Sequence, residues 1–143
     1  AKGSDGWQLH PQVASFAADH HINKSMGSAF AGTDLRAWLE NHGIDTLTVT
    51  GYMTHNCDAA TIYHAAHDGL QVEFLQDATG TLPYANAGGT ASAEEIHRVF
   101  SSDFIRISVA STQDWLAAVR EGKPLEKDNI YLSNQRARKA LAN

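Results

Sequence analysis

The sequence predicts an α/β protein, a three-layer α-β-α sandwich around a mainly parallel, Rossmann-like sheet. Short β-branched and aliphatic segments alternate with amphipathic helical segments, and this alternation favours parallel strands joined by right-handed crossovers. The 143 residues fit one domain of ordinary size. Ligand sites in such sheets lie at the carboxyl ends of the strands, so the predicted strand ends are where chemistry is expected.

The N-terminal third is expected to contain an irregular start, a short strand and a helix. Residues 1–15 are rich in Gly, Ser, Asp and Gln, which indicates irregular backbone, and residues 20–24 have the pattern of a short strand. Residues 34–41 follow the N-cap candidate Thr33, place apolar side chains on one face and stop before Gly43. This third element is therefore predicted to be a helix.

The middle of the chain predicts a strand, a helix and a second strand. Residues 44–50 are β-branched and aliphatic, as in a buried strand. Residues 58–67 predict a helix, which the Asp-Gly pair at 68–69 would end. Residues 71–75 then have the pattern of another buried strand. This unit is expected to form the centre of the fold.

The last part of the chain predicts a loop, two helices and one more strand. A loop rich in Gly, Pro and Asn is expected over residues 77–89, and a helix over 92–100. A strand over 104–109 and a short helix over 112–119 complete the predicted core. Residues 123–143 are polar and are expected to form a C-terminal arm rather than core.

Composition excludes several classes of partner. Lys and Arg number 11 against 16 Asp and Glu, a formal charge of −5, which argues against nucleic acid or an anionic membrane as the main partner. No apolar run approaches the roughly 20 residues that span a bilayer. We therefore expect a soluble, cytoplasmic protein with a small-molecule substrate and no cofactor.

The only cysteine, Cys57, lies where the predicted strand 44–50 gives way to the predicted helix 58–67. The first turn of a helix presents unpaired N–H groups and the positive end of the macrodipole, and both favour a thiolate. Lys24 also lies at a predicted strand end, so the same rule brings its ammonium to the same rim. Free cysteines are often inert packing, so position alone leaves both interpretations open.

Four motifs in order resemble the isochorismatase-like cysteine hydrolases. They are NKSMGSAFAGTDL at 23–35, GI at 43–44, GYMTHNC at 51–57 and DAT at 77–79. The resemblance covers roughly residues 5–110. It implies a catalytic triad of Asp, Lys and Cys, with Lys24 as the lysine and Cys57 as the nucleophile. In that family the Asp acts as the base and the Lys holds the other two in their ionised forms.

The resemblance also implies the environment of the nucleophile. Family members have a cis peptide four residues before the cysteine, which here falls between Tyr52 and Met53. This bond would turn the Met53 N–H toward an oxyanion, beside the N–H of Cys57. The candidate substrate contacts are Phe30, Tyr52, Thr54 and His55.

One member of the implied triad has no match in this sequence. The family's Asp ends the first strand, upstream of the region that here begins at Gly3, and Asp5 lies in a Gly-rich stretch with no apolar strand before it. We therefore expect an N-terminally incomplete domain: a fragment, or part of a longer chain. A partner chain that supplies the strand and the Asp is the alternative.

Other polar residues receive structural interpretations. Eight histidines invite a metal hypothesis, but His64 and His67, three apart on a predicted helix, have no carboxylate or cysteine clearly placed to complete a ligand set, so no metal is expected. Asp58 at the helix start is expected to cap the helix and complement its dipole.

Together these observations predict a hydrolase that cleaves a small amide or imide C–N bond through the Cys57 thiolate and a covalent intermediate. The resemblance also implies a homo-oligomer. Two alternatives stay open: an isochorismatase-type vinyl-ether hydrolase, and a catalytically silent scaffold or oligomerisation module.

Overall fold

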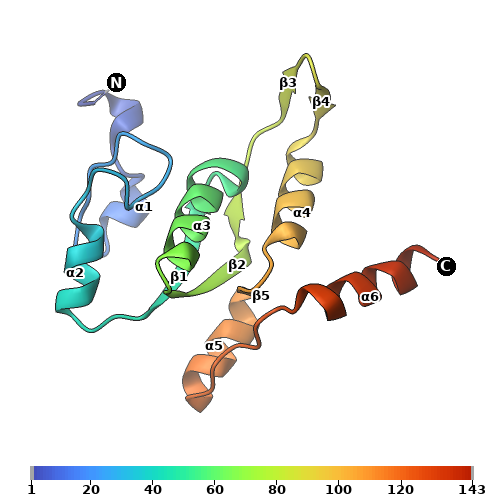
Figure 1. The fold of residues 1–143 in the computed structure, drawn as a ribbon. Helices are drawn as coiled ribbons and strands as arrows, with labels where there is room; N and C mark the ends of the chain where they lie inside the picture. Colours follow the sequence, from blue (N-terminus) through green and yellow to red (C-terminus); the bar gives the residue numbers. More distant parts are fainter. Residues whose placement is uncertain (1, 143) are drawn as a thin grey trace.

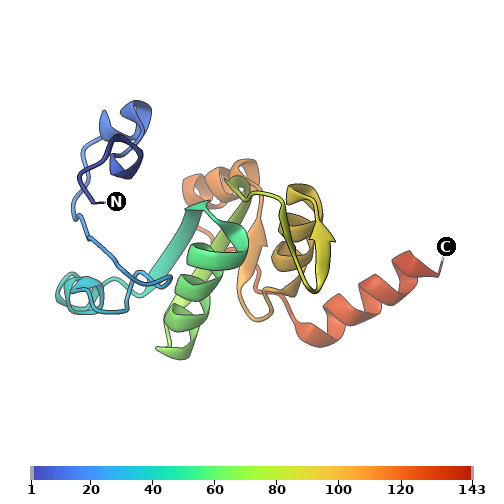
Figure 2. The same cartoon turned by 90° about the horizontal axis from the view of Figure 1, so that it is seen from above.

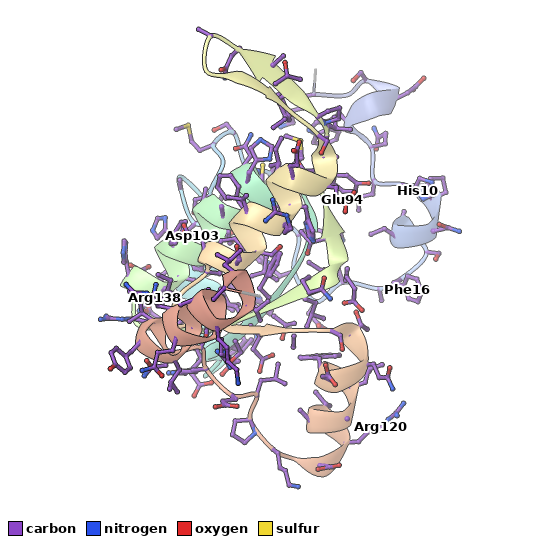
Figure 3. The ribbon with its side chains drawn as sticks, turned by 90° about the vertical axis from the view of Figure 1, so that its right-hand side faces the viewer. His10, Phe16, Glu94, Asp103, Arg120 and Arg138 are labelled. Carbon is purple, nitrogen blue, oxygen red and sulfur yellow. The ribbon has the colours of Figure 1, made fainter. Side chains whose placement is uncertain are left out.

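The computed structural model describes residues 2–142 and confirms the α/β class. Its central sheet is parallel, with the strand order β1-β2-β5. The strands are β1 (Thr46–Tyr52), β2 (Gln71–Gly80) and β5 (Ser108–Ala110). Helices α3 (Ala59–His67) and α5 (Thr112–Glu121) both contact β2, and Figure 2 shows them on opposite sides of the strands. The predicted three layers are therefore present.

The remaining elements surround this sheet (Figure 1). They are the 3-10 turn η1 (Asp5–Trp7), α1 (Pro11–Ala14), α2 (Leu35–Asn41), the π-helical turn η2 (Thr54–Asp58), β3 (Tyr84–Asn86), β4 (Gly89–Ala91), α4 (Ala93–Asp103) and α6 (Ile130–Leu141). Strands β3 and β4 form a separate antiparallel hairpin. In both Figure 1 and Figure 2, α6 extends away from the sheet.

The core lies between the sheet and the helices that pack on it. On α3, Ala59, Ile62 and Ala65 recur every three residues and are all buried, as expected for the inner face of an amphipathic helix. Ile62 is completely buried, as is Phe74 of β2. This packing fixes the end of β1 and the start of α3, where Cys57 lies.

Most predicted helices are confirmed to within a few residues. Helix α2 ends before Gly43, which adopts the left-handed φ of 64° that this stop requires. Helix α4 begins with a capping box, in which Ser92 and Glu95 each accept a hydrogen bond from the other's backbone N–H. Serine and glycine signals in the sequence thus mark real helix ends.

Three predicted elements differ from the structure. Residues 20–24 form no strand; instead the His20 ring stacks on Trp38 at 5.0 Å. The predicted loop 77–89 contains the last part of β2 and the hairpin, because β1 keeps pairing with β2 after a shift in register beyond Val49. Within 104–109 only the end is extended, since Arg106 has a left-handed φ of 70°.

Candidate active site

The structure brings Lys24 and Cys57 into direct contact. The Lys24 ammonium donates a hydrogen bond to Cys57 Sγ at 3.1 Å, and a second one to the Met26 carbonyl at 3.1 Å. Cys57 is half-buried in η2, between the end of β1 and the start of α3. The predicted strand-to-helix corner is therefore real, although a π-helical turn separates the strand from the regular helix. The contact places a positive charge against the Cys57 sulfur.

The turn that carries Cys57 begins at the expected cis peptide, between Tyr52 and Met53. The Met53 carbonyl accepts hydrogen bonds from the N–H groups of Asn56, at 2.9 Å, and Asp58, at 3.3 Å. These bonds close the turn around Cys57. The expected oxyanion-binding role of the Met53 and Cys57 N–H groups stays a prediction.

Thr54 connects this turn to neighbouring elements through buried hydrogen bonds. It is completely buried, and its hydroxyl donates to the Gly80 carbonyl at 3.2 Å. The same hydroxyl lies 2.8 Å from His97 Nδ1, and because its one proton goes to Gly80, His97 is the donor in this second bond. Thr54 thus joins the nucleophile turn to β2 and α4.

Thr61 links the nucleophile to the segment that carries Lys24. Its hydroxyl donates to the Cys57 carbonyl at 2.7 Å and accepts from the Ala29 N–H at 3.0 Å. A second link pairs the Ser28 hydroxyl with His64 Nδ1 at 3.0 Å. Neither link was predicted, because each joins residues more than 30 positions apart through side chains with no distinctive sequence pattern.

The four candidate substrate contacts divide into two pairs. Tyr52 is exposed, and His55 is half-buried next to the ring of Tyr84, 5.0 Å away. Phe30 and Thr54 are buried, and Phe30 belongs to the hydrophobic core. Phe30 and Thr54 thus contribute to packing, and a substrate role for any of the four residues stays a prediction.

Asp58 differs from the expected helix cap. Its side chain makes no capping hydrogen bond, it is only 5% exposed, and its Oδ2 atom is buried without a hydrogen-bond partner among the described residues. Burial raises the pKa of Asp58 from 3.8 to about 6, against an opposing attraction from the Lys24 ammonium. A buried carboxyl therefore lies next to the nucleophile in the chain and within the field of its lysine.

Asp77 of the DAT motif has a structural role. Its carboxylate accepts hydrogen bonds from the Thr112 N–H at 2.7 Å and from the Thr112 hydroxyl at 2.9 Å. These bonds hold the pKa of Asp77 below its usual value. The motif thus ties β2 to the start of α5.

A cavity of about 420 Å³ opens next to Lys24. Its lining residues are Trp7, Gln8, Leu9, His21, Ile22, Asn23 and Lys24. Within residues 2–142, no three His, Cys, Asp or Glu side chains gather as a metal site would require. In the same range no helix is both long and apolar enough to cross a membrane. The cavity beside Lys24 offers space for a small molecule, although Cys57 is not among its lining residues.

Comparison with known proteins gives a consistent set of relatives. The family model described as Isochorismatase domain matches residues 1–102. A crystal structure of an isochorismatase-type protein from Burkholderia xenovorans LB400 is 61% identical, with a TM-score of 0.95 over all of this chain and 70% of that one. A cysteine hydrolase from Pseudomonas syringae pv. phaseolicola 1448A is 25% identical, with a TM-score of 0.78 over 85% of this chain and 58% of that one.

Among curated proteins, streptothricin hydrolase from Streptomyces noursei is 35% identical over 81 residues, which is 57% of this chain and 29% of that protein. The chain spans between 29% and 64% of the length of the curated relatives it matches. The family model covers the region that contains Lys24 and Cys57, and each curated match covers only part of the relative.

Proposed function

This chain belongs to the isochorismatase family, and we propose that it is a cysteine hydrolase that cleaves a C–N bond of a small amide or imide. The observation that carries the proposal is the 3.1 Å contact between Lys24 Nζ and Cys57 Sγ. An ammonium in contact with a thiol compensates the charge of the thiolate, which is the nucleophilic form. Two relatives support the reaction class, since one is a cysteine hydrolase and the other streptothricin hydrolase.

In the proposed reaction, the Cys57 thiolate attacks the carbonyl carbon of the substrate and forms a C–S bond. The C–N bond then breaks, and the nitrogen leaves with a proton as an amine, amide or ammonia. Water attacks the resulting thioester, which releases the carboxylic acid and restores the thiol. Lys24 compensates the charge on sulfur before attack and after release.

Replacement of the nucleophile is the decisive experiment. We expect Cys57→Ala to lower kcat on a hydrolysed amide about 1,000-fold or more, because a covalent pathway is lost. Mass spectrometry of the native protein quenched during turnover is expected to find an acyl group on Cys57. Lys24→Met is expected to lower kcat about 10- to 100-fold, because the thiolate loses its counter-charge. Lys123→Met serves as the matched control, since that lysine lies on the surface, paired with Glu121.

The two alternative functions predict different results in these experiments. A vinyl-ether hydrolase of the isochorismatase type would keep turnover in Cys57→Ala and would give no acyl adduct. A catalytically silent scaffold would turn over neither class of substrate, although the native protein would be folded. Either result would overturn the proposed cysteine mechanism.

A further inference from the structure

We infer that His97 of α4 is a positioning residue for the nucleophile, which acts through Thr54 and requires the imidazole proton on Nδ1. The inference deepens the proposed function, on which it rests for its consequence in turnover. Thr54 is the first residue of η2, the turn that contains Cys57, and it is completely buried. Its hydroxyl lies 2.8 Å from His97 Nδ1, so a side chain of α4 contacts the nucleophile turn directly.

The hydrogen bonds around the imidazole define which nitrogen carries the proton. The Thr54 hydroxyl donates its proton to the Gly80 carbonyl at 3.2 Å, so it can only accept from His97, and Nδ1 is the donor. The other ring nitrogen, Nε2, lies 3.4 Å from the Ser101 hydroxyl, which can donate to it. A neutral imidazole with its proton on Nδ1 satisfies both contacts.

This bond acts at the start of the turn that carries the thiol. Thr54 lies three residues before Cys57, and two N–H groups of the same turn donate to the Met53 carbonyl, so a shift of Thr54 moves the whole turn. Without a donor from His97, the Thr54 oxygen would lose the partner of a buried acceptor site, which costs free energy and favours such a shift. The 3.1 Å contact between Lys24 and Cys57 would then be lost.

Packing is the alternative role of this ring, because it lies 6.4 Å from the ring of Phe74, which is completely buried. Two isosteric substitutions separate the two roles. His97→Asn and His97→Leu both remove the ring, but asparagine keeps an N–H donor on Cγ, where Nδ1 is attached, and leucine has only methyl groups there. Loss of packing would affect both variants equally, whereas loss of the donor affects only the leucine variant.

The test compares these two variants by turnover of a hydrolysed amide and by alkylation of Cys57 with iodoacetamide at pH 7. We expect His97→Leu to lower kcat about 10- to 100-fold and to change KM less than about twofold, because it misplaces the nucleophile rather than a substrate contact. The rate of Cys57 alkylation is expected to fall about threefold or more as Lys24 and sulfur separate. His97→Asn is expected to retain about a third or more of both native rates, since the donor is kept. His67→Leu makes the same change at an exposed histidine of α3 and is expected to leave both rates unchanged.

A double-mutant cycle tests whether His97 acts through Thr54. Thr54→Val removes the hydroxyl that accepts the bond. Addition of His97→Leu to Thr54→Val is expected to lower the alkylation rate no further, because the shared bond is already lost. A further fall as large as that of His97→Leu alone would show that the two residues act independently, and would overturn the inference.

Three other outcomes would overturn the inference. Equal losses in His97→Asn and His97→Leu would assign the ring to packing, and native rates in His97→Leu would show that the bond does not position the turn. The third outcome needs no variant: nitrogen-15 NMR of the native protein at pH 8 is expected to show His97 protonated on Nδ1, and a proton on Nε2 instead would contradict it. Alkylation and NMR require no substrate, so a failure of the cysteine mechanism, seen as turnover in Cys57→Ala, is distinguished from a failure of this inference.

Discussion

The two halves of the candidate site are held in different ways. The nucleophile segment, residues 52–67, follows the end of β1, and its helix buries Ile62 in the core. The lysine segment, residues 20–33, has no helix or strand; it is held by side-chain hydrogen bonds to α3 and by Phe30, which is buried in the core. Backbone pairing and core packing therefore fix the thiol, whereas the ammonium lies in a segment with no backbone pairing to the sheet, which core packing reaches only at its C-terminal end, through Phe30. The ammonium is the part of the site that small changes can move.

The largest expected effect compares the same substitution in the two segments. Ile62→Ala is expected to lower the free energy of unfolding by about 3 kcal/mol, because it leaves a cavity in a completely buried position. Ile22→Ala in the lysine segment is expected to cost about 1 kcal/mol, because that side chain is only half-buried. Urea denaturation measures both values. Equal losses would show that the lysine segment belongs to the cooperative core as fully as α3 does.

This contrast also explains which parts of the fold could be predicted. The strand-helix-strand unit around Cys57 has local signals that agree with its packing: β-branched residues before the turn and Ala59, Ile62 and Ala65 on one helix face. Residues 20–24 have the composition of a strand but pair with no other strand, so local pattern alone was misleading there. Backbone pairing is a long-range property, and a short segment does not specify its partner.

A second prediction uses pH to probe the nucleophile segment alone. Burial raises the folded-state pKa of Asp58 to about 6, above its ordinary 3.8, so the folded protein holds this proton more tightly than the unfolded chain does. The resulting stabilisation is full below about pH 4 and is lost as pH rises through 6. Between pH 4 and 7, Asp58 alone is expected to lower the free energy of unfolding by about 2 kcal/mol.

The measurement is the difference in unfolding free energy between the native protein and Asp58→Asn across that pH range. Subtraction is required because Asp77 and Glu95 also make the free energy of unfolding depend on pH. Hydrogen bonds lower the pKa values of these two carboxylates, so the stabilisation that they give is lost as pH falls, which is the opposite of the Asp58 effect. A difference that does not vary with pH would mean that the Asp58 carboxyl is solvated in the folded protein.

The reactive residues of the candidate site could be predicted from the sequence, but the residues that hold them in place could not. The strand-end rule and a distinctive motif both point to Cys57, whereas Lys24 could be found from the motif alone, because residues 20–24 form no strand; the structure places the two residues in contact. His97 and Thr61 have no such signal, because common residue types gain their roles only from contacts across the fold. Asp58 gave a misleading signal, since an acidic residue before a helix usually caps it, and here the side chain turns inward.

The smallest expected effect on stability tests the link between the two segments. Thr61→Val keeps the shape of the side chain but removes the hydroxyl that joins the Cys57 carbonyl to the Ala29 N–H. We expect a loss of about 1 kcal/mol in the free energy of unfolding. Because the lysine segment depends on such bonds, the rate of Cys57 alkylation at pH 7 is expected to fall about threefold or more as Lys24 moves from sulfur.

Thr50→Val, at an exposed position of β1, is the matched control. Loss of stability without loss of alkylation would show that the ammonium is positioned by its own bond to Met26 rather than by α3.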